Sequence, residues 1–516
     1  MKHLAVPLLL SFITLPAELV GAIRFDLQGR RGPSARHLHK RGTIAGSTSL
    51  DDANNIAYTL NLTLGGSQFE VQIDTGSSDL YVAGNVPGSQ NTGKTTSVTY
   101  AIGEAEGPIK TATMDFLGFA VENQAFLDLT ANSQNQTAGS GLIGLGPHTG
   151  SQIQEVLGNG SGDPPLDRIF QLDKSTPNYI TVLLGRADDP KDPIQGNLTI
   201  GEVLPGYSNL TSQPKLNVTV LPNTEAVGQH WQTLLDADGI IGPNGRVVDV
   251  TTGVASTSND KQLTVVFDTG YTLAQVPSAV AEAFYESVPG AKLVNVAALG
   301  GPTWEIPCDY EINVTLKFGG ISFPVNPLDT AMNLSAAGVS GSTCYGGFQP
   351  NVNAKSPLYD MIFGMAFLRN VYMLINFGDF VDNTTNTRAN PYVQLLSVSN
   401  NSAQIHSDFV SLRGDKSWNT NSAVNKAESW ARSHLRIVIG ISIALGLLVI
   451  GGIITACTRF RRRRLSRTPA GFMSMQSSYQ PLSEPAPQEA HDLHLMGTSQ
   501  QQYAGGGYAN PWDSRY

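Results

Sequence analysis

The sequence contains few of the residues and patterns that define several common classes of protein. Only three cysteines occur in 516 residues, too few for a scaffold held together by disulfide bonds. The net charge is −9 and the folded part offers no basic face, which argues against a nucleic-acid binder. No Gly-rich phosphate loop and no His-x-x-x-His or Cys-x-x-Cys pattern occurs. We therefore expect no cofactor and no metal ion, and we expect the nine scattered histidines at the surface.

The residues that are abundant favour β structure over long helices. Val, Ile, Thr and Tyr cluster in short alternating runs that glycine pairs such as Gly65-Gly66 interrupt. The best helical pattern covers residues 278–288. The runs that we expect to form strands are AYTLNLTLGG (57–66), FEVQID (69–74), TATMDFLGFAV (111–121), YITVLLG (179–185), KLNVTVLP (215–222), INVTLKFGGISFPV (312–325) and VYMLINFG (371–378). This all-β pattern is too long for a single small sandwich.

Both ends of the chain indicate passage through the secretory pathway. Residues 1–22 have the basic start, apolar centre and small final residues of a signal peptide, and Pro7 and Pro16 disfavour a buried helix there. Residues 437–458 carry no charge and are long enough to span a bilayer. An arginine cluster follows them, which places the tail, 459–516, in the cytoplasm. The tail is rich in Ser, Gln, Pro and Gly, and we expect it to be disordered. We expect a single-pass type I membrane protein at the cell surface, or in an endosomal or vacuolar membrane.

Asn-x-Ser/Thr sequons agree with this topology, because ten precede the expected span and none follows it. They lie at Asn61, Asn135, Asn159, Asn197, Asn209, Asn217, Asn313, Asn333, Asn383 and Asn400.

Two polar segments flank the folded part. Residues 23–41 are basic and end in Lys40-Arg41; they are either a solvated disordered segment or, as we favour, a pro-segment that a dibasic-specific processing protease removes. Residues 401–436 are rich in Ser, Asn and charged residues, and we interpret them as a stalk.

The tripeptide Asp-Thr-Gly occurs twice, at Asp74 and Asp268, each time after an apolar run. Each half also contains, further along, an apolar-apolar-Gly segment, at 141–147 and at 361–370. The repeated order is what a duplicated lobe would produce.

These features resemble the pepsin-like aspartic proteases over about residues 55–398. The similarity is carried by AYTLNLTLGGSQFEVQIDTGSSDLYVAG, SVTYAIGEAEGPI, WEIPCDYEINVTLKFGGISFPV and MIFGMAFLRNVYMLINFG. The resemblance implies an all-β bilobal acid protease fold with its active-site cleft between two lobes, 42–220 and 221–400, followed by the transmembrane helix. With its signal and anchor, the chain resembles the fungal membrane-anchored, yapsin-like surface members.

The resemblance also implies the roles of individual residues. Asp74 and Asp268 would share one proton and activate water for hydrolysis of a peptide bond. Thr75, Gly76, Ser77, Thr269 and Gly270 would support this dyad; Tyr100 and Gly103 would lie in the flap that covers substrate, and Cys308 and Cys344 would form a disulfide.

The sequence departs from the family pattern after the second glycine, where Tyr271 and Thr272 replace the usual Thr or Ser. Either the Tyr271 phenol supplies the missing hydrogen bond, or Asp268 loses a donor and its pKa rises. Tyr81 stands where Trp is common. We hold Tyr81, Tyr271 and Thr272 as uncertain substrate-binding residues.

Glu104 and Glu106 follow the flap tyrosine. They either form a solvated turn, which we favour, or select basic residues near the cleaved bond.

We predict a monomeric aspartic endopeptidase that cleaves peptides or proteins at acidic pH. The alternative is a catalytically weak or inactive pepsin-fold surface glycoprotein that binds peptides or acts in the cell wall. A non-enzymatic adhesion protein would explain the sequons but not the duplicated Asp-Thr-Gly.

Overall fold

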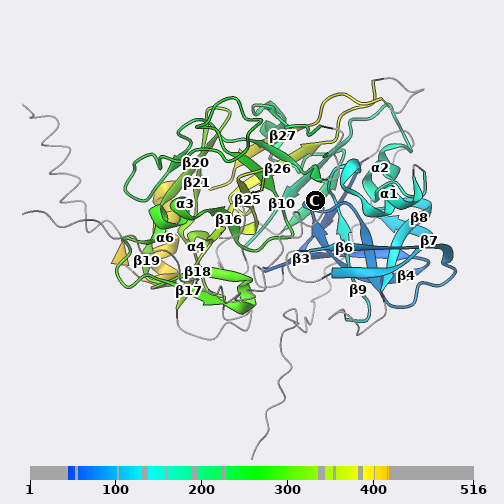
Figure 1. Cartoon of the computed structure of the whole chain (residues 1–516), viewed down its shortest axis with the longest axis horizontal. Coiled ribbons are helices and arrows are strands. Elements are labelled where there is room, and N and C mark those ends of the chain that lie inside the picture. The colour runs from blue at the N-terminus through cyan, green and yellow to red at the C-terminus, as the bar shows by residue number, and fades with distance from the viewer. Residues whose placement is uncertain are drawn as a thin grey trace, which may run out of the picture. The chain divides into compact units, whose positions relative to one another are not determined.

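The computed structural model describes residues 45–52, 56–100, 104–129, 137–158, 160–186, 196–222, 225, 228–334, 343–351, 356–381, 387–399, 401–414 and 416–417 (Figure 1). Among these residues, no helix is long and apolar enough to span a membrane. The expected signal peptide, pro-segment, span and tail lie outside the described residues, as do Gly103, Asn135, Asn159, Asn383 and Asn400.

The first half of the chain forms an eight-stranded sheet, which is blue and cyan in Figure 1. Its strands, in spatial order, are β2 (Asp51–Asp52), β3 (Tyr58–Leu64), β4 (Ser67–Asp74), β9 (Ser140–Gly144), β5 (Leu80–Ala83), β8 (Phe119–Leu129), β7 (Glu104–Phe116) and β6 (Gln90–Thr99). Alternate residues of β3 are buried, from Tyr58 to Leu64, as the apolar alternation predicts. The turn to β4 is made by Gly65 and Gly66, whose φ angles of 58° and 82° suit glycine.

The second half builds a five-stranded sheet around β15 (Thr264–Phe267), and smaller sheets surround it. The five-stranded sheet has the order β13 (Gln232–Leu234), β15, β25 (Met361–Phe363), β16 (Ala274–Pro277) and β24 (Phe348–Asn351). The smaller sheets are β14 (Ile240–Ile241) with β20 (Val314–Phe318) and β21 (Ile321–Val325); β17 (Lys292–Val296) with β18 (Gly301–Ile306), β23 (Cys344–Gly346) and β22 (Ala331–Met332); and β19 (Tyr310–Glu311) with β28 (Lys416–Ser417).

The two halves repeat one strand arrangement. β4 pairs in parallel with β9, and β15 pairs in parallel with β25. The strand that follows each Asp-Thr-Gly, β5 or β16, pairs antiparallel with the same partner, β9 or β25. The order of Asp-Thr-Gly and apolar-apolar-Gly segments in the sequence therefore corresponds to a duplicated structural unit.

A six-stranded sheet joins the halves, because it takes strands from both. Its order is β1 (Gly46–Ser49), β11 (Asn197–Ile200), β10 (Tyr179–Leu183), β26 (Val371–Asn376), β27 (Tyr392–Ser397) and β12 (Leu216–Asn217). The main hydrophobic core is continuous across this region. The ring centroid of Phe377 lies 5.1 Å from that of Phe170 and 4.6 Å from that of Trp231.

Helices are short, as expected for this mostly β chain. They are α1 (Gln152–Leu157), α2 (Pro165–Phe170), α3 (Ser278–Tyr285), α4 (Pro327–Thr330), α5 (Met365–Leu368), α6 (Ser402–Arg413) and the 3-10 turns η1 (His148–Gly150), η2 (Ser208–Ser212) and η4 (Ala297–Leu299). The helix expected over 278–288 is present but ends at Tyr285. The strand expected over 215–222 is reduced to Leu216–Asn217.

A buried ionic cluster also connects the halves. The Arg186 guanidinium, from the first half, and that of Arg369, from the second, both pair with Asp329 at 2.6 Å. Burial acts to raise the pKa of Asp329, but the two guanidinium groups hold it below its ordinary value. Asp329 is therefore kept ionised, and it holds both halves at one point.

Candidate active site

The two Asp-Thr-Gly aspartates lie at the ends of equivalent strands. Asp74 is the last residue of β4, and Asp268 directly follows β15. The apolar residues of both strands are almost completely buried, so each strand delivers its aspartate into the interior. Only 4% of Asp74 and 2% of Asp268 is exposed.

The threonines after the aspartates cross-link the two turns. The Thr75 N–H donates to Thr269 Oγ1, and the Thr269 N–H donates to Thr75 Oγ1, both at 3.0 Å. The Thr75 hydroxyl donates to the carbonyl of Phe267 and the Thr269 hydroxyl to that of Ile73, at 2.9 and 3.1 Å. This reciprocal network fixes the two turns, and with them the two aspartates, against each other.

The glycines allow the closest approach in the site. The Gly76 N–H donates to Asp74 Oδ1 at 2.9 Å, and the Gly270 N–H donates to Asp268 Oδ1 at 2.7 Å. A Cβ on Gly76 would lie 2.0 Å from Asp268 Oδ2, and one on Gly270 would lie 2.6 Å from Asp74 Oδ1. No side chain fits at either position while the carboxyl groups stay where they are.

The two aspartates share a hydrogen bond but differ in their surroundings. Burial raises the pKa of Asp74, whereas hydrogen bonds from the Ser77 hydroxyl and from backbone N–H groups oppose the rise. Burial, and then the adjacent charge of Asp74, raise the pKa of Asp268 well above its ordinary value. The arrangement favours an ionised Asp74 beside a protonated Asp268.

At the second aspartate, hydrogen bonds from backbone N–H groups stabilise the ionised form. The donors that lower the pKa of Asp268 are the backbone N–H groups of Gly270 and Gly76. Thr272 donates instead to the carbonyl of Ile56 at 2.9 Å, and Tyr271 packs against an apolar cluster that includes Tyr359.

The flap residues lie on the hairpin of β6 and β7. Tyr100 follows β6 and packs edge-on against Tyr81, with the ring centroids 5.8 Å apart. Burial raises the pKa of Tyr100 well above its ordinary value, and the charges of Asp74 and Asp79 act in the same direction, so Tyr100 lies near the dyad. Glu104 is exposed on this hairpin, whereas its neighbour Ala105 faces Val98 and is buried.

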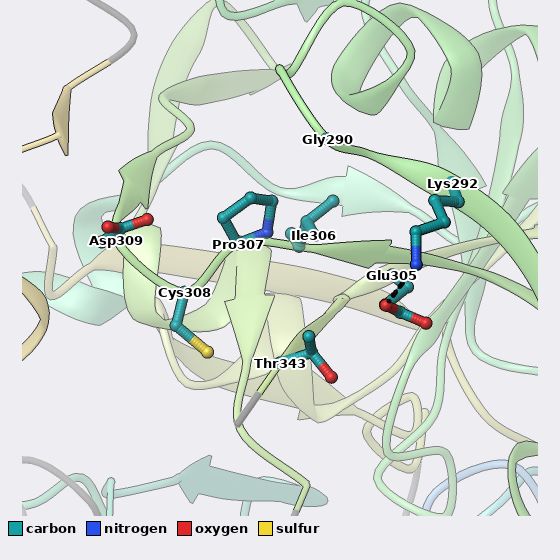
Figure 2. A pocket seen from close by; sticks show the side chains of 8 residues that line it. All are labelled: Gly290, Lys292, Glu305, Ile306, Pro307, Cys308, Asp309 and Thr343. Atoms are coloured by element: carbon teal, nitrogen blue, oxygen red, sulfur yellow. Dashed lines mark hydrogen bonds and ion pairs between the residues drawn. The ribbon is translucent and has the colours of Figure 1, made fainter. Parts of the chain in front are cut away.

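Cys308 and Cys344 form the expected disulfide. Beside it lies an open hollow, where Lys292 and Glu305 pair at 3.0 Å (Figure 2). Neither Asp74 nor Asp268 lines this hollow. Helix α6 lies close by, since Arg413 donates to Cys344 Sγ at 2.7 Å and His406 pairs with Glu311 at 2.6 Å. The first part of the segment that we interpret as a stalk is thus helical and packed, with Phe409 buried.

The six sequons within the described residues lie where a glycan could extend from the surface. Five asparagines are exposed and Asn197 is half-buried; the exposed ones are Asn61, Asn209, Asn217, Asn313 and Asn333.

The expectation of surface histidines is wrong for His230, of which only 3% is exposed. Its Nδ1 lies 3.1 Å from the carbonyl oxygen of Gly76, and its ring lies against Tyr359. Nothing in the local sequence marks it, because its burial comes from strands that are distant in the chain.

Comparisons with known proteins agree with the geometry. The family described as "Eukaryotic aspartyl protease" matches residues 86–383, a stretch that contains Asp268 and begins after Asp74. "Major aspartyl peptidase 1" of Cryptococcus neoformans var. grubii is 28% identical over 69% of this chain and 75% of its own length. "Rhizopuspepsin-2" of Rhizopus niveus is 27% identical over 67% of this chain and 83% of its own. The crystal structure of an aspartic proteinase from Irpex lacteus superposes with a TM-score of 0.51, at 21% identity, over 70% of this chain and 99% of that one.

Proposed function

The chain belongs to the eukaryotic aspartyl protease family, and from this premise we propose that Asp74 and Asp268 are its catalytic dyad, working at acidic pH. It is an aspartic endopeptidase of the pepsin family, so its substrates are peptides or proteins. The observation that carries the proposal is the burial of two carboxyl groups at one point, joined by a hydrogen bond and held by the reciprocal contacts of Thr75 and Thr269.

The difference between the two carboxyl groups supports an assignment of roles. Ionised Asp74 takes a proton from a water molecule, whose oxygen then attacks the carbonyl carbon of the peptide bond. Protonated Asp268 gives its proton to the carbonyl oxygen, and a tetrahedral diol forms. Collapse of the diol transfers a proton to the leaving nitrogen and breaks the C–N bond. Because the two groups titrate as a pair, this assignment describes the dominant protonation state.

The remaining residues support this chemistry. Gly76, Gly270 and Ser77 orient the carboxyl groups through their hydrogen bonds. Tyr100 lies on the flap hairpin, where closure would exclude water from the bound peptide.

The direct test is cleavage of a mixed peptide library by the full chain from pH 3 to pH 7. Asp74→Asn and Asp268→Asn are expected to abolish cleavage, and Asp249→Asn, at an exposed position, is the matched control. A statine-type inhibitor, which mimics the tetrahedral diol, should block the wild type. Cleavage that survives either dyad substitution would show that the dyad is misassigned.

A catalytically weak, peptide-binding protein is the second candidate. Its support is the departure from the family pattern after Gly270, where Tyr271 stands in place of the usual Thr or Ser. Stoichiometric binding of the inhibitor by folded wild-type chain, without cleavage at any pH, would favour this candidate over the enzyme.

We also propose how the chain is divided into lobes, processed and anchored in the membrane. The lobes would comprise residues 42–220 and 221–400, after removal of the pro-segment at Lys40-Arg41, and the span 437–458 would anchor them in a type I orientation like the yapsin-like proteases. The sequence features of both ends and the exposed sequons support it. Resistance of the full chain to alkaline extraction from membranes, with sensitivity of its sequons to a glycosidase, would test it; release by alkali alone would contradict the anchor.

A further inference from the structure

One face of the five-stranded sheet borders the second aspartate. Phe267 and Phe363 belong to the main core, whereas their neighbours in the chain, Val266 and Ile362, belong to a separate apolar cluster. Successive residues of a strand point to opposite faces of the sheet, so Val266 and Ile362 mark the face that turns away from the main core. Both line one small recess together with Asp268. The dyad therefore lies on this face.

Two glutamines continue the same face across the sheet. Gln275 of β16 is opposite Ile362 of β25 and also opposite Gln349 of β24. Residues that are opposite one another on paired strands point to the same side. The preceding residues, Ala274 and Phe348, lie in the main core on the other side. The face thus runs from the recess beside Asp268 to a pair of amide side chains.

Hydrogen bonds fix the orientation of both amides. Gln349, of which 4% is exposed, donates through Nε2 to the carbonyl oxygen of Leu299 at 3.1 Å. Because a carbonyl oxygen can only accept, Gln349 must turn its own oxygen the other way, toward Gln275. Gln275 Nε2 donates to that oxygen at 2.6 Å. The Leu299 carbonyl therefore sets the orientation of Gln349, and Gln349 sets that of Gln275.

The oxygen of Gln275 is left at the end of this relay. The side chain is half-buried, and its Oε1 accepts no hydrogen bond from the residues that the structure describes. An amide oxygen has two lone pairs and carries no formal charge. The relay thus presents an oriented, uncharged acceptor on the face that borders the dyad.

The position of Gln275 in the sheet gives its approximate distance from the cleaved bond. Adjacent strands are about 4.8 Å apart, so Gln275 lies about 10 Å across the sheet from Val266, with Ile362 between them. Asp268 is two residues further along the chain than Val266, or about 7 Å. An extended peptide advances about 3.3 Å per residue. Gln275 would therefore meet a substrate residue about two to four positions from the cleaved bond, since its own side chain shortens the gap.

We propose that Gln275, oriented by Gln349, selects substrates with an uncharged hydrogen-bond donor, as in Asn, Gln, Ser or Thr, at one position near the cleaved bond. The inference rests on the proposed function. An apolar substrate side chain at this position would cover the Gln275 oxygen without pairing it, which is unfavourable. The two amides carry no charge, so they offer no counter-ion to Lys or Arg.

The test compares peptides that differ in a single donor. A peptide that the full chain cleaves is made with Gln or with Met at each of the six positions that lie two to four residues from the bond, on either side. Met has about the length of Gln but no donor. The measured quantity is the ratio of kcat/KM for the Gln peptide to that for the Met peptide, in which the fraction of active enzyme cancels.

In the wild type we expect a ratio of about three to ten at one position, the range that one neutral hydrogen bond provides. Gln275→Met should bring this ratio to about one. Gln349→Met removes the acceptor that orients Gln275, so its ratio should lie between those two. Gln404→Met, at an exposed glutamine of helix α6, is the matched control and should keep the wild-type ratio. Gln275→Ala carries the same expectation as Gln275→Met, should the latter fail to fold.

A ratio near one at all six positions in the wild type would overturn the proposal, as would a wild-type ratio in Gln275→Met. A wild-type ratio in Gln349→Met would overturn the relay.

Binding separates this inference from the proposed function. Asp74→Asn should bind both peptides without cleaving them, and its Kd for the Gln peptide should be the lower one. Cleavage that survives Asp74→Asn refutes the dyad. Equal Kd values and equal kcat/KM values for the two peptides refute only the role of Gln275. Should the wild type cleave neither peptide, the proposed function fails, and a difference in Kd that Gln275→Met removes would still support the selection.

Discussion

Substitution of Gly76 by alanine should damage catalysis far more than folding. The added Cβ would lie 2.0 Å from Asp268 Oδ2, and real Cβ contacts below 3.0 Å essentially never occur. The carboxyl group, or the Asp74 turn, must therefore move by about 1 Å. A displacement of that size at reacting groups lowers the rate by about 100-fold, which corresponds to about 2.7 kcal/mol of transition-state stabilisation.

The assay compares kcat/KM of Gly76→Ala, Gly270→Ala and Gly301→Ala at the pH optimum, after active-site titration. At Gly270 the Cβ would lie 2.6 Å from Asp74 Oδ1, so the loss should be smaller than at Gly76. Gly301 is the control, because the nearest atom would be 3.7 Å from its Cβ and its activity should be unchanged. A Gly76→Ala enzyme within threefold of the wild type would refute the argument that this glycine holds the carboxyl groups together.

Three further predictions concern stability. Because the pKa of Asp268 is raised in the folded state, its contribution to stability is present at low pH and is lost as pH rises through the folded value. Asp268→Asn should therefore have a higher Tm than the wild type at pH 7 and a similar Tm at pH 3; an equal difference at both would contradict this. Asp329→Asn leaves Arg186 and Arg369 buried without their carboxylate, so it should lower the free energy of unfolding, measured in urea, by about 3–5 kcal/mol. The exposed control, Asp249→Asn, should leave this free energy unchanged. Joint replacement of Cys308 and Cys344 by serine removes a link between residues that lie 36 positions apart, and it should lower the free energy of unfolding by about 3–4 kcal/mol. An unchanged urea midpoint would show that the disulfide does not stabilise the fold.

The sequence predicted those parts of the site that depend on local pattern. An apolar run followed by Asp-Thr-Gly, repeated in the same order with an apolar-apolar-Gly segment, predicts two equivalent strands and a duplicated lobe. The structure pairs β4 with β9 and β15 with β25 accordingly. The departure after Gly270 was equally local, and in the structure the Gly270 N–H donates to Asp268 Oδ1.

What the sequence did not predict depends on tertiary packing. His230 is buried by Val266, Tyr359 and Ile362, which come from two other strands and the segment before one of them. Helix α6 has almost no apolar face, so its composition resembles that of a stalk. Phe409 is its one buried residue, and the contacts of His406 with Glu311 and of Arg413 with Cys344 also attach it to the second half. The run 215–222 alternates as a strand should, but only Leu216 and Asn217 of it form a strand, which pairs with β27.

Two buried groups, His230 and Asp268, change the stability of the fold in opposite directions as pH changes. His230 has a folded pKa of about 4, below the ordinary 6.5. Its contribution to stability is therefore full above pH 6.5 and is lost as pH falls to about 4, a change of about 3 kcal/mol. Asp268 has the reverse dependence, because its folded pKa is raised.

Stability should thus be greatest at mildly acidic pH, where His230 is neutral and Asp268 is still protonated. Replacement of His230 by a residue that does not titrate should extend this stability toward lower pH. Removal of the Asp268 charge should separate stability from cleavage, with a fold that is more stable at neutral pH and an enzyme that no longer cleaves.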